Sequence, residues 1–132
     1  QIYGSSETAP IAIYQRADSP VRAAAAFGEG GLFLRLVEMA YGGGLGVRLD
    51  LDAFGAARWD GILFAEAAGS LLLAVAADAD PAVLFGDLPW REIGRVEAEP
   101  HITIVRGGST VVSLDVDDLV RAWESTFAEV TL

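Results

Sequence analysis

Two clusters of glycine enclose the most apolar helical stretch of the chain, and this arrangement constrains its fold. Residues 28–31 read Gly-Glu-Gly-Gly, residues 32–41 are apolar except at Arg35 and Glu38, and residues 42–44 are three further glycines. A helix that is apolar nearly all round is stable only where other elements cover most of its surface. We therefore expect residues 32–41 to form a helix that the rest of the chain covers.

Strand signals follow this helix at several places. Alternating or continuous apolar residues predict strands at 47–51, 71–75, 92–97, 102–106 and 110–114, with a further short strand at 11–14. The run 71–75 has no polar residue, which is typical of a strand buried on both faces. Gly107-Gly108 predicts a hairpin between the last two strands.

The remaining helical signals are shorter or lie at the end of the chain. Asp80-Pro81 begins a short helix that Gly86 closes, and residues 53–64 form a short helix or an irregular stretch. A final helix begins near Asp115, and its apolar face contains Val116, Leu119, Val120, Trp123 and Phe127. This mixed order predicts an α/β (α+β) fold, a mixed β-sheet covered by helices. Residues 21–132 are expected to form the domain, after a poorly defined segment at 1–20.

The residue types that are missing exclude several mechanisms. The 132 residues contain no Lys, no Cys and no Asn, and His101 is the single histidine. The chain therefore has no Schiff-base amine, no P-loop lysine, no thiol nucleophile and no thiolate or polyhistidine metal site. A net charge of −10 argues against nucleic acid and anionic membranes as partners.

The residues that remain as candidates each have a structural reading beside a functional one. The turn at 28–31 is either a tight strand-to-helix turn or a place where backbone N–H groups meet a phosphate. It is not a dinucleotide fingerprint, because Phe33 stands where the third glycine would be. The acidic residues near 50, 80 and 115 are expected to cap helices rather than bind metal. His101 has no nucleophile motif beside it, and we predict no catalytic residue in the chain.

Several motifs, in order, resemble one family. Gly30-Gly31-Leu32, Glu38-Met39-Ala40 and the stretch 43–47 look like the G-G-L, E-M-A and G-G-L-G motifs of phosphoribosylformylglycinamidine synthase, in its C-terminal domain. That domain is shared by the aminoimidazole ribonucleotide synthetase superfamily. Residues 63–69 resemble its L-F-S-E-S-x-G motif, 93–96 its I-G-x-V, and 107–123 the C-terminal end of the synthase.

The resemblance implies an ATP-dependent ligase of purine biosynthesis that works in the cytoplasm. That enzyme forms an amidine from formylglycinamide ribonucleotide and ammonia, with ATP and Mg in the full-length protein. In the family the glycine-rich turn faces a nucleotide cleft shared with an N-terminal domain. The implied cofactor-binding residues are Glu29, Gly30 and Gly31 in the first motif and Glu66 and Gly69 in the second. The expected partner is that ATP-binding domain or a homologous subunit, and a homodimer is a further possibility.

The departures from the family pattern concern polar side chains. The family's His, Asp and Ser before the glycines are Ala25, Ala26 and Gly28 here, the two serines of the second motif are Ala65 and Ala67, and its Arg is Ser70. We therefore expect the chain alone to be inactive and to bind no cofactor tightly. Two hypotheses follow, a C-terminal domain or fragment of the synthase, or a degenerate non-catalytic binding or assembly module. The alignment also assigns residues 21–27 to a strand, although their alanines favour a helix.

Overall fold

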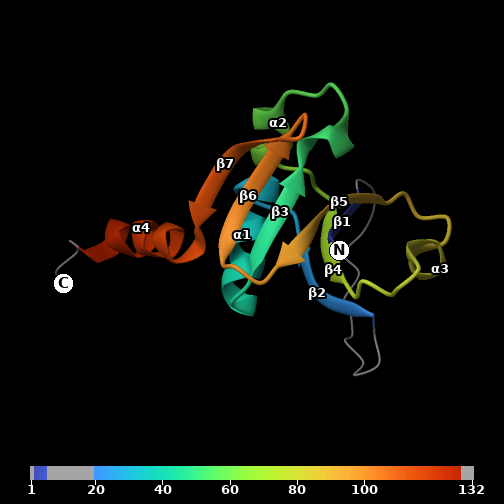
Figure 1. The fold of residues 1–132 in the computed structure, drawn as a ribbon, viewed down its shortest axis with the longest axis horizontal. Helices are drawn as coiled ribbons and strands as arrows, with labels where there is room; N and C mark the ends of the chain where they lie inside the picture. The colour runs from blue at the N-terminus through green and yellow to red at the C-terminus, as the bar shows by residue number, and fades with distance from the viewer. Residues whose placement is uncertain (1, 6–19, 129–132) are drawn as a thin grey trace.

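Seven strands form a single mixed sheet in the order β2-β4-β1-β5-β3-β6-β7 (Figure 1). The computed structural model describes residues 2–5 and 20–128. The strands are β1 (Ile2–Ser5), β2 (Val21–Ala26), β3 (Gly46–Asp50), β4 (Leu71–Val75), β5 (Arg91–Glu97), β6 (His101–Arg106) and β7 (Ser109–Asp115). Strands β3 and β6 pair in parallel and the other pairs are antiparallel, so the predicted mixed sheet is confirmed.

The described helices lie in the connections between strands or, in one case, after the last strand. They are α1 (Gly31–Gly43), α2 (Trp59–Phe64), α3 (Pro81–Phe85) and α4 (Val116–Ala128), with one 3₁₀ turn, η1 (Leu51–Phe54). Figure 1 shows α1 behind β3 and β6, so this helix covers one face of the sheet. No helix among the described residues has both the length and the apolar character that a membrane crossing requires.

The main core lies between α1 and the sheet. Leu32, Leu36 and Ala40 follow one another at four-residue spacing and are at most 2% exposed. They pack with buried residues of the strands, among them Leu49 and Ile104. Helix α1 is therefore buried on this face and only partly covered on its other sides, where Tyr41 is 55% exposed, so the cover that its apolar sequence predicted is found in part.

Strand β4 is buried on both faces, as its uninterrupted apolar run predicted. Leu72 belongs to the main core, whereas Leu73 and Val75 form a second cluster on the opposite face. Leu84 and Phe85 of α3 pack against this second cluster. The short helix α3 therefore covers β4 on the face that α1 leaves open.

The predicted caps are confirmed. The Asp50 carboxylate accepts from the Asp52 N–H at 2.9 Å, that of Asp80 from the Ala82 N–H at 2.9 Å, and that of Asp115 from the Asp118 N–H at 3.0 Å. Each carboxylate stands where a strand or loop passes into a helix, and it satisfies an N–H group that the helix leaves unpaired.

Two segments differ from what the sequence alone indicates. The alanine-rich β2 is a strand, as the family alignment predicted, because its pairing with β4 outweighs a helix preference of well under 1 kcal/mol per residue. Strand β1 was not predicted, yet it lies between β4 and β5 in the sheet. The strand expected at 11–14 lies outside the described residues, as does the side chain of Phe127.

Gly94 marks a close approach between β5 and β3. A Cβ atom built on Gly94 would lie 2.1 Å from the Arg48 carbonyl oxygen, a backbone atom that cannot turn aside. The strand pairing therefore requires glycine here, which is a physical reason for the glycine of the 93–96 motif.

We expect Gly94→Ala to lower the free energy of unfolding by about 1–3 kcal/mol, because the added methyl group overpacks the sheet. Urea denaturation followed by circular dichroism measures this loss. The matched control is Gly61→Ala in α2, where no atom lies within 4 Å of the new Cβ. That control should be neutral or stabilising by up to about 1 kcal/mol, and equal stability of both variants would contradict the close approach.

Candidate functional site

The glycine turn and the loop of the second motif lie at the same edge of the sheet. The turn follows β2, and the loop at 65–70 precedes β4. Because β2 and β4 are antiparallel, with Ala26 opposite Leu71, the end of one strand lies beside the start of the other. The Phe27 N–H donates to the Ser70 carbonyl at 2.9 Å and continues this pairing beyond the strands. The sheet topology thus brings together two motifs that are far apart in the sequence.

Gly31 is the point of direct contact between the turn and the loop. A Cβ on Gly31 would lie 2.8 Å from the Leu63 carbonyl oxygen and 2.9 Å from that of Ala65. Gly31 also has φ +64°, a left-handed conformation that L side chains rarely adopt. Beside this contact, the rings of Phe33 and Phe64 pack with their centroids 5.7 Å apart. The start of α1 therefore rests on the last residues of α2 and on Ala65, which follows them.

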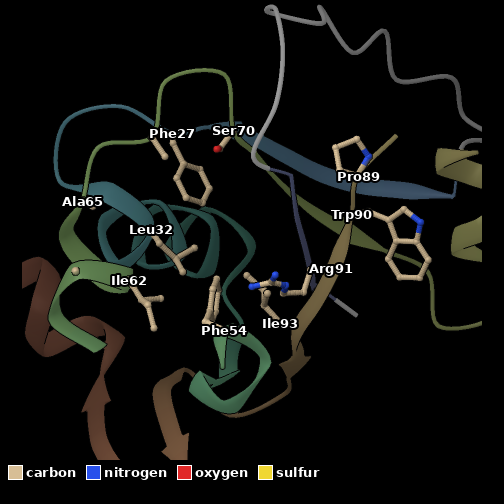
Figure 2. A pocket seen from close by; sticks show the side chains of 12 residues that line it. Phe27, Leu32, Phe54, Ile62, Ala65, Ser70, Pro89, Trp90, Arg91 and Ile93 are labelled. Atoms are coloured by element: carbon tan, nitrogen blue, oxygen red, sulfur yellow. The ribbon is translucent and has the colours of Figure 1, made fainter. Parts of the chain in front are cut away.

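A cavity of about 340 Å³ opens between the turn, the loop and the start of β5. Figure 2 shows the side chains around it, with Phe27 and Leu32 on one side and Phe54 and Ile93 on another. The lining residues are Phe27, Leu32, Phe54, Gly61, Ile62, Ala65, Ala67, Ser70, Pro89, Trp90, Arg91 and Ile93. The lining is mainly apolar, and Arg91 is the charged residue among these twelve.

Arg91 is a binding candidate that the sequence analysis missed. Its guanidinium carbon lies 5.4 Å from the centre of the Phe54 ring, within the range of a cation–π interaction. Figure 2 shows the Arg91 side chain directed toward Phe54, whereas Trp90 points away from Phe54. The centroid of the Trp90 ring lies 5.8 Å from that of the Phe85 ring. A guanidinium held beside an apolar cavity is suited to bind the anionic end of a ligand.

The five residues assigned from the resemblance lie around the cavity but do not line it. Glu29, Gly30 and Gly31 form the turn, and Glu66 and Gly69 lie in the loop. Of these five residues only Gly31 is buried. The structure therefore brings the two groups together, although neither glutamate lines the cavity.

Arg35 ties the turn to α1. Its Nη1 donates to Glu38 at 2.5 Å and its Nη2 to the Glu29 carbonyl at 3.3 Å. Its Nε is buried without a hydrogen-bond partner. The guanidinium therefore holds the backbone of the turn in place.

Helix α2, which leads into the loop, begins with an exposed ion pair. Arg58 donates to both carboxylate oxygens of Asp60, at 3.0 and 2.6 Å. Through this hydrogen bond the Arg58 guanidinium holds the pKa of the Asp60 carboxyl below its usual range. An ion pair this exposed adds little stability.

The other polar candidates lie elsewhere. His101 Nε2 is 3.9 Å from Asp115 Oδ2, between β6 and β7. Within residues 2–5 and 20–128, no group of three or more His, Asp or Glu side chains converges as a metal site requires. The cavity between turn and loop is therefore the candidate site, because it lies where the two motifs meet.

The fold and the site define an α/β domain in which a glycine turn and a second loop flank one pocket. Residues 7–107 match the family model described as "AIR synthase related protein, C-terminal domain". The chain belongs to this family.

The curated relatives are much longer than this chain. The phosphoribosylformylglycinamidine synthase subunit PurL of Deinococcus radiodurans is 38% identical over 99 residues, which cover 73% of this chain and 13% of that protein. The subunit of the same name from Synechococcus elongatus is 35% identical over 113 residues, 78% of this chain and 14% of that protein. This chain thus spans about an eighth of the length of these relatives.

Solved structures share the fold. PurL from Thermotoga maritima complexed with ATP matches with a TM-score of 0.66 at 19% identity, over 74% of this chain and 18% of that one. The same protein complexed with FGAR matches with a TM-score of 0.65 at 20% identity, over 75% and 18%. At this level of identity the likeness establishes the fold.

Gly31→Ala should disturb the contact between turn and loop. We expect a loss of at least about 2 kcal/mol in unfolding free energy, from the left-handed φ together with the clash against Leu63 and Ala65. Chemical denaturation measures the loss, and amide NMR should show shifts concentrated in residues 28–32 and 63–70. Gly42→Ala, in the same helix with no atom within 4 Å of its Cβ, is the control and should be neutral or slightly stabilising. Unchanged amides at 63–70 in Gly31→Ala would contradict the contact.

Proposed function

We propose that this chain is the C-terminal domain of a phosphoribosylformylglycinamidine synthase and contributes to ATP-dependent amidine formation in purine biosynthesis, in the cytoplasm. The observation that carries the proposal is the meeting of the two family motifs at one pocket. Relatives of that name at 34–38% identity support it.

The chain's own groups suit the binding of a phosphorylated ligand. The first N–H groups of α1 have no partner within the helix and carry the positive end of its dipole, and among them that of Gly31 donates to the Gly28 carbonyl at 3.1 Å. Arg91 adds a guanidinium on the β5 side, and the apolar lining accommodates an uncharged part of the ligand. When bound, ATP would supply the phosphoryl group that converts the amide oxygen into a leaving group, so that ammonia adds at the amide carbon and phosphate departs. Under this proposal, the domain binds and orients the ligand through backbone groups of Glu29, Gly30 and Gly31, with Glu66 and Gly69 nearby.

The described residues fit a phosphate better than a metal ion. They contain no convergent group of three or more acidic or histidine side chains. We therefore propose that magnesium, which accompanies ATP in the family, is bound mainly by residues outside this domain.

The proposed partner is the N-terminal ATP-binding domain of the same enzyme or a homologous subunit. Large apolar side chains near the pocket support this, since Trp59 and Phe64 of α2 are 47% and 53% exposed, and Trp90 is 40% exposed. Exposed aromatic side chains at a cleft are typical of a surface that another domain covers. A solved structure from Thermotoga maritima with the same fold carries the name PurLQS.

A degenerate, non-catalytic module is the second candidate. The observation that favours it is the presence of Ala65 and Ala67 in the pocket lining, where the family motif has serines. Residues without hydrogen-bonding side chains at those positions leave the scaffold intact and remove polar contacts to a substrate.

A domain exchange separates the two candidates. We expect a chimera of the Deinococcus radiodurans subunit, with its C-terminal domain replaced by this chain, to restore growth of a purine-requiring strain without added purine. The intact subunit is the positive control and the subunit truncated before that domain is the negative control. A chimera that is folded and soluble but fails to restore growth would favour the non-catalytic module.

The 132 residues alone are expected to show no turnover of ATP with formylglycinamide ribonucleotide and ammonia, because under this proposal the ATP-binding domain supplies the other half of the cleft and the family's polar side chains are replaced here. A coupled assay for ADP release measures this. Turnover above that of a heat-denatured sample would refute the expected inactivity.

Arg91 should contribute to weak ligand binding by the isolated chain. Nucleotide titrations followed by amide NMR are expected to shift residues 29–31 and 65–70, and Arg91→Ala should weaken binding by about ten- to a hundredfold, the loss of one hydrogen bond to a charged group. The control is Arg95→Ala on the same strand, since Arg95 pairs with Glu97 at 3.1 Å and does not line the cavity. Equal affinities of the two variants would exclude a role for Arg91.

A further inference from the structure

Ser70 is a polar residue buried in the wall of the cavity. It is 4% exposed and is the one buried polar residue among those whose burial the structure describes. Ser70 ends the 65–70 loop directly before β4, and Figure 2 shows its side chain beside that of Phe27. A hydroxyl group therefore lies at the wall of a cavity whose lining is mainly apolar.

The Ser70 hydroxyl has no hydrogen-bond partner among the residues that the structure describes. The backbone of Ser70 is fixed on both sides, because its N–H donates to the Ala67 carbonyl at 3.1 Å and its carbonyl accepts from the Phe27 N–H at 2.9 Å. Among the described residues, the side-chain atom that is both sealed from solvent and unpaired is Arg35 Nε. The unpaired Ser70 oxygen is therefore not sealed, and a ligand in the cavity can reach it.

Arg91 supplies the charge of the cavity. Its guanidinium carbon lies 5.4 Å from the centre of the Phe54 ring, and no Asp or Glu is among the described lining residues. The chain carries 19 acidic residues, so a lining without a carboxylate favours an anion locally. The cavity thus presents one cation and one neutral hydroxyl within an apolar and aromatic surface.

This lining defines the chemical class of ligand that it suits. One guanidinium offsets one anionic group, and a polyphosphate would meet no further cation among the described lining residues. The volume of about 340 Å³ is near the lower end of the roughly 300–1,000 Å³ that is usual for small-molecule sites. The cavity therefore suits a small compound with one phosphate and one uncharged polar group better than a complete nucleoside triphosphate.

The hydroxyl is suited to recognise that uncharged group. A serine hydroxyl can donate to a carbonyl oxygen or accept from an amide N–H. A site that hydrogen-bonds a polar group of its ligand discriminates against analogues without that group, because the buried partner is then left unpaired. Ser70 therefore provides selectivity that the apolar lining cannot provide.

We propose that Ser70 is a specificity-determining residue of the cavity, whose hydroxyl hydrogen-bonds the amide group of a small ligand while Arg91 binds its single phosphate. This inference rests on the proposed function, because it takes the phosphorylated ligand to occupy this cavity. It adds which part of such a ligand is recognised there and by which side chain.

Titrations of the full chain, followed by amide NMR, compare two probes. Formylglycinamide ribonucleotide has amide groups and one phosphate, whereas ribose 5-phosphate has the phosphate without an amide. Ser70→Ala should weaken binding of the ribonucleotide by about three- to tenfold, the loss of one neutral hydrogen bond, and should leave binding of ribose 5-phosphate unchanged. Arg91→Ala should weaken binding of both probes.

Thermal denaturation of the free chain separates binding from a structural role. Because the Ser70 hydroxyl bonds no described residue, Ser70→Ala should not lower the denaturation midpoint. The matched control is Ser113→Ala, an exposed serine of β7 outside the cavity, which should change neither affinity nor midpoint. A lower midpoint of Ser70→Ala, together with weaker binding of both probes, would assign the hydroxyl a structural role and overturn the proposal.

The outcomes distinguish this inference from the proposed function. If the unaltered chain bound neither probe, the binding role that the proposed function gives to the cavity would fail together with this inference. If both probes bound and Ser70→Ala affected them equally, this inference alone would be overturned. Selective loss of the ribonucleotide in Ser70→Ala, together with a chimera that fails to restore growth, would support this inference and remove the catalytic role.

Discussion

The antiparallel pairing of β2 with β4 is the interaction on which the candidate site depends. Both the glycine turn and the 65–70 loop are extensions of these two strands, and the bond from Phe27 to Ser70 extends their pairing by one step. The turn then passes so close to the loop that only glycine fits at position 31. Strand pairing therefore brings the two motifs together at the pocket, and Leu32, Ala65 and Ala67 of these motifs contribute to its lining.

The elements that the sequence predicts well are those whose pattern of apolar residues depends directly on which of their faces are buried. Strand β4 is apolar throughout because it is buried on both faces, and the apolar residues of α1 at positions 32, 36 and 40 are those that pack in the core. The hairpin at Gly107-Gly108 and the three caps depend on local chemistry and were predicted for the same reason. Strand β1 carries no such pattern, since its four residues are held by β4 and β5, which follow it by more than sixty positions. Its place in the sheet depends on distant strands, so the residues near β1 in the sequence could not predict it.

The sequence likewise predicts one part of the candidate site and not another. The turn and the loop could be predicted, because motifs in the sequence mark them. Arg91 and Phe54 could not, since they stand on different elements 37 positions apart and meet only after β5 and η1 have packed. The glutamates of the two motifs show the reverse case. The motifs suggested Glu29 and Glu66 as binding residues, but neither side chain lines the cavity.

The contrast between a retained backbone and absent polar side chains bears on what such a domain can still do. Backbone N–H groups at a helix start persist whatever side chains are replaced, so affinity for a phosphate does not require the family's His, Asp or Ser. A guanidinium is less strongly hydrated than an ammonium and stacks on aromatic rings, so an apolar pocket accommodates Arg91 at a smaller desolvation cost than a lysine. Under the proposed function, binding and chemistry therefore depend on different atoms. Binding depends on the fold and on Arg91, whereas bond formation depends on groups that the partner domain supplies.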